Sequence, residues 1–377
     1  MKKIILGFIL ILSSGYANAQ SNIEKDVTDI AAKYKAIGVS YVVIKNDKII
    51  HENAIGYQSI EEQKKLDVKN SVFRIASISK SFTATALMQL VQEGKISLDD
   101  DFGKLIGFPV RNPKFPDDII TLRMVLSHTS SINDVNGYFD LDVINPSINK
   151  DWAKSYNAYK PGTEYQYCNL NFNMSGAVLE RLTNKRFDVY IKDQILNPLG
   201  LYGGYCVDSL DQSRLTSLYA YDNKSKEFEV QPAAYNPRRE EIQQYVIGQS
   251  TPIFSPTGGM KISAHDLAIY MQMHMNYGKA KNKRILKKKY AQEMQTKLSE
   301  KDGYGLALKE TNNLIKGEAL VGHTGSAYGV YSSMFFNPKK KFGIVVITNG
   351  CIPTYENGNV AVIAEITNYL YSSLINK

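Results

Sequence analysis

The sequence predicts a mixed α/β (α+β) fold, with one mostly antiparallel sheet built from both chain ends and a mostly helical lobe inserted between them. Segments typical of strands occur near the start and again near the end of the chain, whereas the middle is more polar and its periodic segments are helical. With 377 residues, the chain is long enough for one large bilobed domain. We expect an α/β lobe of about residues 20–100 and 251–377, flanked by helices, and a helical lobe of about residues 101–250.

The first elements are expected to be an antiparallel hairpin followed by a long helix. Residues 39–45 and 48–57 are typical of strands, and Asn46-Asp47 between them is typical of a tight turn. Apolar side chains recur at helical spacing over residues 77–93, and Gly94 supplies a stop.

The remaining elements follow from the same two periodicities. The turn residues 337–341 are expected to join the last two strands as a hairpin. We expect helices over residues 121–128, 172–183, 186–195, 263–276 (with Ser263 as N-cap) and 359–374, and strands over residues 304–309, 328–336 and 342–349.

The N-terminus has the pattern of a cleavable signal peptide. Lys2 and Lys3 form a basic region, residues 4–12 form a short apolar region, and Ala17-Asn18-Ala19 fits a cleavage site. We expect residues 1–19 to be removed after Ala19, which leaves a periplasmic or secreted chain that begins at Gln20. The apolar region is too short to span a bilayer, and no integral membrane segment is expected in the mature chain; an uncleaved anchor is the alternative.

Composition and motif patterns narrow the classes of function. The formal net charge of +8 is interpreted as solvated surface, and no nucleic-acid-binding module is recognisable. Patterns typical of metallo-hydrolases, α/β-hydrolases and nucleotide-binding loops do not occur, so neither a metal nor a cofactor is expected. The odd number of cysteines, three, leaves at least one unpaired. The oligomeric state stays open.

Ser77 and Lys80 are the first candidates for chemistry. Residues three apart on a helix are neighbours on one face, so the amine can lie beside the hydroxyl. A serine hydroxyl needs a base to take its proton, and a desolvated lysine amine can serve. A helix N-terminus at Ser77 would also favour negative charge there. The pair alone fits an ordinary surface helix equally well.

The surroundings of this pair resemble the serine β-lactamase and DD-peptidase superfamily, most closely its class C β-lactamase-like branch. The matching segments occur in the family's order and extend over most of residues 35–350. They are Phe73–Thr83 around the S-x-x-K motif, Thr121–Ser130, Pro161-Gly162, Tyr165–Asn169 with the Y-x-N motif, Ser255–Met260, and Gly322–Gly325 with an H-T-G motif.

The resemblance implies a role for each matching residue. Ser77 is the nucleophile, while Lys80 and Tyr167 share the general-base duty and Tyr167 relays a proton to the leaving group. The backbone N–H groups of Ser77 and Ser326 form the oxyanion hole, where donors stabilise developing charge. Asn169 orients Lys80 and the substrate amide. The substrate-binding residues are Asn169, His323, Thr324 and Gly325.

Two positions depart from the family pattern. His323 stands where true β-lactamases carry lysine, and a histidine is only partly protonated near neutral pH. It therefore anchors a substrate carboxylate less well, which favours esterase-like or peptidase-like activity over antibiotic hydrolysis. Cys168 stands where the family usually has serine, and packing is the preferred interpretation of this small side chain.

We therefore expect an exported serine hydrolase that forms an acyl-enzyme on Ser77 and cleaves a small amide or ester, such as a D-amino-acid peptide. Three alternatives stay open: an acyltransferase that uses an alcohol or amine acceptor, a true β-lactamase, and an inactive sensor module on the same fold. For the hydrolase, the acyltransferase and the β-lactamase, the expected partner is a small-molecule or peptide acyl substrate. Its identity depends on loops in residues 130–160 and 205–250, which carry no readable motif.

Overall fold

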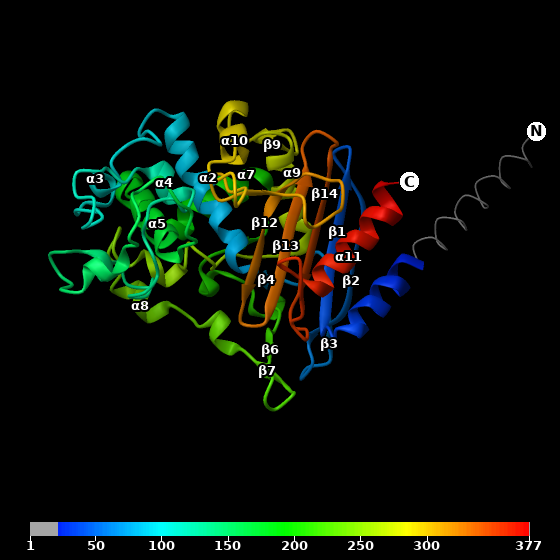
Figure 1. Ribbon diagram of the computed structural model, residues 1–377. Coiled ribbons are helices and arrows are strands. Elements are labelled where there is room, and N and C mark those ends of the chain that lie inside the picture. The colour runs from blue at the N-terminus through cyan, green and yellow to red at the C-terminus, as the bar shows by residue number, and fades with distance from the viewer. Residues whose placement is uncertain (1–21, 377) are drawn as a thin grey trace, which may run out of the picture.

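The computed structural model describes residues 22–376, and segments from both ends of the chain meet in one seven-stranded sheet (Figure 1). The strand order is β11-β12-β13-β14-β1-β2-β3, and each neighbouring pair is antiparallel. This confirms the predicted fold class. The expected signal peptide, residues 1–19, lies outside the described residues.

The central pairing of the sheet joins β1 to β14, with Val39 opposite Thr348. A smaller sheet has the order β4-β8-β5, and three two-stranded ribbons complete the set. The strands are β1 (Gly38–Lys45), β2 (Lys48–Ser59), β3 (Lys64–Lys65), β4 (Phe73–Arg74), β5 (Gly203–Gly204), β6 (Tyr219–Tyr221), β7 (Phe228–Val230), β8 (Lys261–Ile262), β9 (Lys279–Ala280), β10 (Lys283–Arg284), β11 (Lys309–Thr311), β12 (Leu320–Ala327), β13 (Val330–Asn337), β14 (Phe342–Thr348), β15 (Tyr355–Glu356) and β16 (Asn359–Val360).

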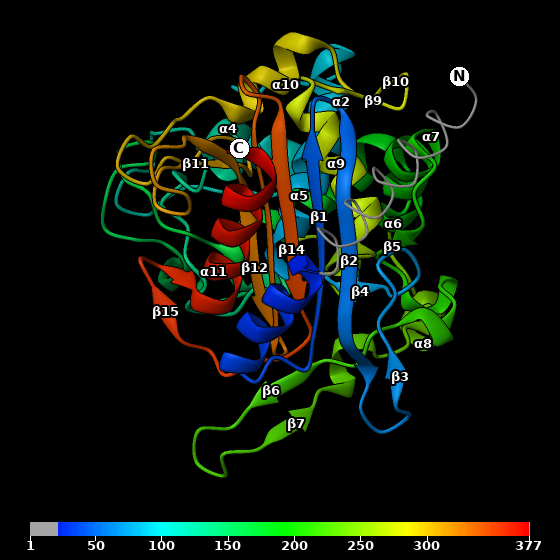
Figure 2. The ribbon, with the colours of Figure 1, turned by 90° about the vertical axis from the view of Figure 1, so that its right-hand side faces the viewer.

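Helices occupy both faces of the large sheet, as the two views in Figures 1 and 2 show. The α-helices are α2 (Ser79–Gln92), α3 (Phe102–Ile106), α4 (Leu122–Leu126), α5 (Asn169–Thr183), α6 (Phe187–Ile191), α7 (Asn197–Leu199), α8 (Arg239–Gln243), α9 (Ala264–Met275), α10 (Lys288–Gln295) and α11 (Ala361–Leu370), and residues 22–33 are also helical. Short 3₁₀ helices are η1 (Ala76–Ile78), η2 (Leu141–Ile144), η3 (Trp152–Ser155), η5 (Val207–Ser209), η6 (Gln212–Arg214), η7 (Pro232–Tyr235) and η8 (Thr251–Phe254). Two π-helical segments are η4 (Lys192–Leu196) and η9 (Tyr371–Ile375).

Strand β1 divides the apolar core into two layers because its side chains alternate. Val39, Tyr41 and Val43 pack with α11 and the helix at residues 22–33, whereas Val42 and Ile44 pack with α9 and α2. In the described part of the chain, every helix is too short or too polar to cross a bilayer.

Local turn and cap chemistry confirms several predicted boundaries. Asn46 and Asp47 have φ values of 50° and 63°, as a tight hairpin turn requires. The Ser263 side chain accepts a hydrogen bond from the Asp266 N–H and caps α9. Gly94 has a φ of 73° just after α2.

One predicted strand was wrong. Residues 304–308 form a loop, and β11 begins only at Lys309. Ala307 has a φ of 59°, which a strand does not allow. Gly305 lies so close to the neighbouring main chain that a Cβ atom there would be 2.6 Å from the Met294 carbonyl oxygen.

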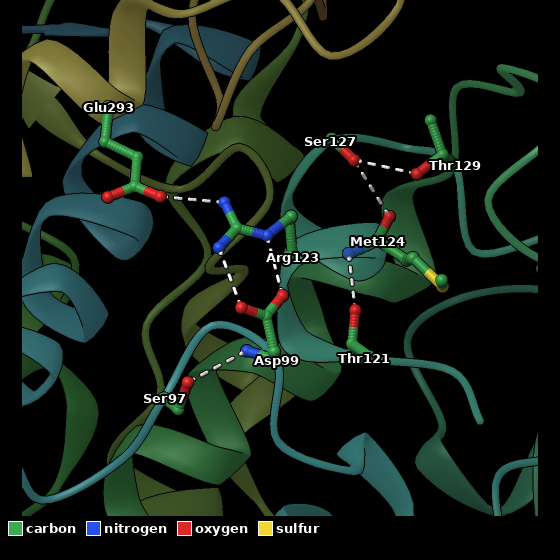
Figure 3. Close-up of polar contacts among 8 residues, drawn as sticks. All are labelled: Ser97, Asp99, Thr121, Arg123, Met124, Ser127, Thr129 and Glu293. Atoms are coloured by element: carbon green, nitrogen blue, oxygen red, sulfur yellow. Dashed lines mark hydrogen bonds and ion pairs between the residues drawn. The ribbon is translucent and has the colours of Figure 1, made fainter.

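Polar contacts hold α4 and the start of the loop that follows it in place (Figure 3). Thr121 Oγ1 accepts a hydrogen bond from the Met124 N–H at 3.3 Å. Arg123 binds both carboxylate oxygens of Asp99, at 2.8 Å and 3.0 Å, and reaches Glu293 on α10 at 2.8 Å. Helix α4 is thereby joined to the segment after α2 and to α10.

A fully buried carboxylate, Glu180 on α5, holds the helical region together. It accepts hydrogen bonds from the Phe187 N–H at 2.6 Å, from the Gly248 N–H at 2.7 Å, from Thr251 Oγ1 at 2.7 Å and from the Tyr245 hydroxyl. These donors come from two segments, the start of α6 and residues 245–251, so one side chain joins both of them to α5.

We expect Glu180→Ala to lower the free energy of unfolding by about 3 kcal/mol or more, because several buried donors lose their acceptor. Urea denaturation measures the change. The exposed Glu227→Ala should stay within about 0.5 kcal/mol of the parent. Equal effects of the two variants would contradict a structural role for Glu180.

Candidate active site

The main chain presents Ser77 on a strained turn between β4 and α2. Ala76 has a φ of 48°, which is uncommon for a residue with a side chain. Ser77 lies in η1, and α2 begins two residues later than predicted, at Ser79. From residue 71 to residue 90, every position except Ser77 is buried. The turn therefore exposes this hydroxyl and little else.

Lys80 lies one turn further on and is fully buried. Its Nζ lies 3.2 Å from Ser77 Oγ, 2.9 Å from Asn169 Oδ1 and 3.0 Å from the Thr257 carbonyl oxygen. Burial lowers the pKa of Lys80 to about 7, and Asp134 opposes this shift. A large fraction of the amine is therefore neutral at neutral pH.

The partners of Lys80 determine where its lone pair points. The Thr257 carbonyl oxygen and Asn169 Oδ1 can only accept hydrogen bonds, so they take the two N–H groups of a neutral amine. The third direction, toward Ser77 Oγ, is left for the lone pair. In this arrangement the serine hydroxyl can donate its proton to the lysine.

Tyr167 lies over the same amine. Lys80 Nζ is 4.7 Å from the centre of the Tyr167 ring. Burial raises the pKa of Tyr167, and the Ser77 hydroxyl opposes the shift. Tyr167 is therefore a neutral phenol at physiological pH, with a hydroxyl proton that it can donate.

Asp134 was missed by sequence reasoning, and it orients Asn169. Its carboxylate accepts hydrogen bonds from Asn169 Nδ2 at 2.9 Å, from the Asn169 N–H at 2.8 Å, from the Leu170 N–H at 2.9 Å and from Cys168 Sγ at 3.2 Å. The first contact turns Asn169 Oδ1 toward Lys80. Asp134 follows the matching segment Thr121–Ser130 closely, which is the one signal that could have indicated it.

The three cysteines and His128 lie in the interior of the protein. Cys168, Cys206 and Cys351 are all free and buried. Burial and Asp134 raise the pKa of Cys168 well above its usual value, which keeps it a thiol. His128 is buried and accepts a hydrogen bond from the Cys168 N–H at Nδ1, 3.1 Å away. The packing interpretation of Cys168 agrees with this geometry.

Strand β12, which carries the predicted oxyanion partner Ser326, packs against η1, the turn that carries Ser77. A Cβ atom on Gly325 would lie 2.2 Å from the Ile75 carbonyl oxygen, so only glycine allows this close approach of β12 to the main chain before Ser77. Ser332 on β13 donates a hydrogen bond to the same oxygen at 2.9 Å. Thr324 is half-buried and Ser326 is exposed on this edge.

His323 is buried and uncharged. Its Nδ1 contacts the Thr324 carbonyl oxygen, which can only accept, so Nδ1 carries the hydrogen. Its Nε2 accepts a hydrogen bond from the Tyr304 hydroxyl at 2.9 Å. Burial, together with the charge of Lys80, lowers the pKa of His323 to about 3. Both ring nitrogens are therefore occupied within the protein, and the ring carries no positive charge toward a substrate.

The fold and the arrangement of the S-x-x-K, Y-x-N and H-T-G segments are those of the serine β-lactamase and DD-peptidase superfamily. The Beta-lactamase family model matches residues 23–367, and the chain belongs to this family. Members of this superfamily include serine hydrolases such as D-amino acid amidases.

Three known proteins illustrate the similarity. Protein flp of Staphylococcus aureus (strain N315) is 26% identical over 347 residues, which cover 88% of this chain and 63% of that protein. An octameric penicillin-binding protein homologue from Pyrococcus abyssi superposes with a TM-score of 0.73 at 26% identity, covering 93% of this chain and 77% of that one. A D-amino acid amidase from Ochrobactrum anthropi SV3 has a TM-score of 0.70 at 19% identity, with 96% and 99% covered, which shows the shared fold.

Replacing Lys80 should reveal the free-energy cost of its burial. The pKa is about 7 in the folded chain and 10.5 in the unfolded chain, so between these values the unfolded state binds the extra proton. The stability of the parent relative to Lys80→Met should therefore rise by about 1.4 kcal/mol per pH unit above pH 7. Urea denaturation at pH 7, 8 and 9 tests this; parallel pH profiles would contradict it.

Proposed function

We propose that the protein is an exported serine hydrolase that forms an acyl-enzyme on Ser77. The observation that carries the proposal is the geometry of Lys80, whose lone pair is directed at Ser77 Oγ by two acceptors of its N–H groups. A lowered pKa is what a general base at neutral pH needs. Burial of a lysine side chain lowers the stability of the folded state, and a role as general base explains why the chain tolerates this cost.

The proposed reaction begins with proton transfer from Ser77 Oγ to Lys80 Nζ as the oxygen attacks the substrate carbonyl carbon. The N–H groups of Ser77 and Ser326 receive the charge on the carbonyl oxygen. Tyr167 then donates its hydroxyl proton to the leaving group and recovers one from the Lys80 ammonium. Water then attacks the carbonyl carbon of the acyl-enzyme and gives a proton to the neutral Lys80 amine. The bond from this carbon to Ser77 Oγ breaks, Lys80 returns the proton to Ser77 Oγ, and the acid is released.

We infer a substrate whose binding does not depend on a carboxylate held by a cation, such as a D-amino-acid amide, a D-amino-acid peptide or a small ester. An uncharged His323 does not supply the cation that a lysine would offer to the carboxylate of a β-lactam. The structural likeness to a D-amino acid amidase supports an amide of this class as the first substrate to test.

Incubation of the protein with a fluorophosphonate should place one covalent adduct on Ser77. The rate should rise from pH 5.5 to 8.5 with a midpoint near 7, because only the neutral Lys80 amine accepts the proton. Mass spectrometry of protein collected from the periplasm or medium locates the adduct and also gives the N-terminus, expected at Gln20.

Two variants make this test decisive. Ser77→Ala should abolish labelling, whereas Ser326→Ala should keep it, because the proposed contribution of Ser326 is its backbone N–H. Labelling that survives in Ser77→Ala would refute the mechanism. Rapid turnover of nitrocefin would instead favour a true β-lactamase, and a product mixture that shifts toward added alcohols or amines would favour acyl transfer.

Asp134→Asn tests the positioning of the base through Asn169. The amide nitrogen cannot accept hydrogen bonds, so Asn169 loses its fixed orientation, and labelling should slow by about 10-fold or more. Because the Asp134 charge raises the pKa of Lys80, the midpoint of the pH profile should also move below its parent value. The exposed Asp140→Asn is the control. Slower labelling with an unchanged midpoint would mean that Asp134 acts on structure alone.

A further inference from the structure

Two basic side chains outside the set of reacting groups face each other across the small sheet. Arg74 on β4 and Lys261 on β8 are directly opposite in the antiparallel register. Both are buried, with 8% and 5% of their surfaces exposed. Two positive charges at directly opposite positions of a sheet are unfavourable, so a charged Lys261 beside Arg74 requires a negative counter-charge.

Main-chain oxygen atoms provide the hydrogen-bond acceptors for both side chains. Arg74 Nε donates to the Gly258 carbonyl oxygen at 3.0 Å, and Nη1 donates to the Ala234 carbonyl oxygen at 3.1 Å. Lys261 Nζ donates to the Tyr205 carbonyl oxygen at 2.6 Å. These contacts satisfy donors but bring no negative charge.

Nearby carboxylates are committed to other cations. Asp188 binds Arg186 through both of its oxygens, at 2.6 Å and 3.0 Å. Asp208 binds Arg239 at 3.0 Å. Within the described residues, neither Arg74 nor Lys261 has a carboxylate within ion-pair distance.

Both basic side chains line one pocket of about 280 Å³. Arg238 lines it as a third basic side chain and forms an ion pair with Glu241, which does not line the pocket and whose side chain is 42% exposed. Tyr328 contributes a ring that lies 4.9 Å from the Arg74 guanidinium carbon. The pocket therefore has a size suited to a small molecule and a positive lining without an acidic counterpart.

We propose that this pocket is a binding site for a small anion that carries a carboxylate or phosphate group, held by Arg74, Lys261 and Arg238. A planar guanidinium and an ammonium on neighbouring strands offer several donors to the oxygens of one such group. The bound charge would allow Lys261 to be protonated beside Arg74, because it offsets the repulsion between the two positive charges.

The site is connected to the catalytic segment through the main chain. Arg74 precedes Ser77 by three residues and binds the carbonyl oxygen of Gly258. The adjacent Thr257 carbonyl oxygen accepts a hydrogen bond from Lys80. An anion that orders Arg74 would therefore also order the loop that holds the catalytic amine.

Anion binding would change the protonation of Lys261. Burial and the charge of Arg74 lower the pKa of Lys261 well below its usual value. A bound negative charge favours the ammonium form and raises this pKa. Binding should therefore be accompanied by proton uptake.

Thermal unfolding in sodium phosphate, sodium acetate and sodium chloride at equal ionic strength tests the site. We expect phosphate or acetate to raise Tm by about 3 °C or more in a saturable way, with chloride as the reference. Whichever anion is effective identifies the phosphate or carboxylate chemistry. Equal Tm values in all three salts would overturn the proposal.

The variants Lys261→Met and Arg238→Gln separate this pocket from other basic surface. Lys261→Met removes the buried amine and keeps most of the length of the side chain, so the variant is expected to fold, and its affinity for the effective anion should fall at least about 10-fold. Exposed Lys95→Met is the matched control and should bind as the parent does. An unchanged response of both pocket variants would refute the site.

Calorimetric titration of the parent with the effective anion, in two buffers of different ionisation enthalpy, gives a second readout. Proton uptake in the parent that disappears in Lys261→Met supports the assignment. Uptake that persists in this variant contradicts it. These measurements need no turnover, so they stand or fall independently of the proposed hydrolase activity.

Discussion

The Lys80 amine lies in a site without solvent contact, where oxygen atoms from three separate segments of the chain surround it. An ammonium ion is unfavourable there, so this environment favours the neutral amine. The proposed role of Lys80 as a general base requires that neutral form. The helix that carries Lys80, the loop at Thr257 and the start of α5 must all be in place for the environment to exist. Most of the packing around the site can be understood as a means of keeping that one group dry and oriented.

The orientation is maintained by a relay of side chains. Asp134 fixes the amide of Asn169. The amide oxygen and the Thr257 carbonyl oxygen fix two of the directions around Lys80, and the remaining direction leads to Ser77. The strained Ala76 and the close approach of β12 at Gly325 position the serine from the other side. A neutral His323, held by Tyr304, completes the edge without adding charge.

The sequence was informative where chemistry is local and uninformative where it depends on three-dimensional neighbours. The turn at Asn46-Asp47, the cap at Ser263 and the order of the short motifs follow from local residue types, and the fold class followed from them. Asp134 lies in a loop whose sequence has no periodicity, and its importance comes from partners 34 to 36 residues away. The charge state of His323 likewise depends on burial and on Tyr304, which the sequence places in a strand that does not form.

The pairing of β1 with β14 has a consequence for how the molecule comes into being. Ser77 and Lys80 belong to the early part of the chain, but the strand edge beside them is completed only when the last strands dock onto the first hairpin. Contacts between such distant segments form late, because closing a long loop is entropically costly. A nascent or unfolded chain therefore carries Ser77, the proposed nucleophile, without the surroundings that the proposed chemistry requires, and these surroundings are complete only when the whole sheet closes.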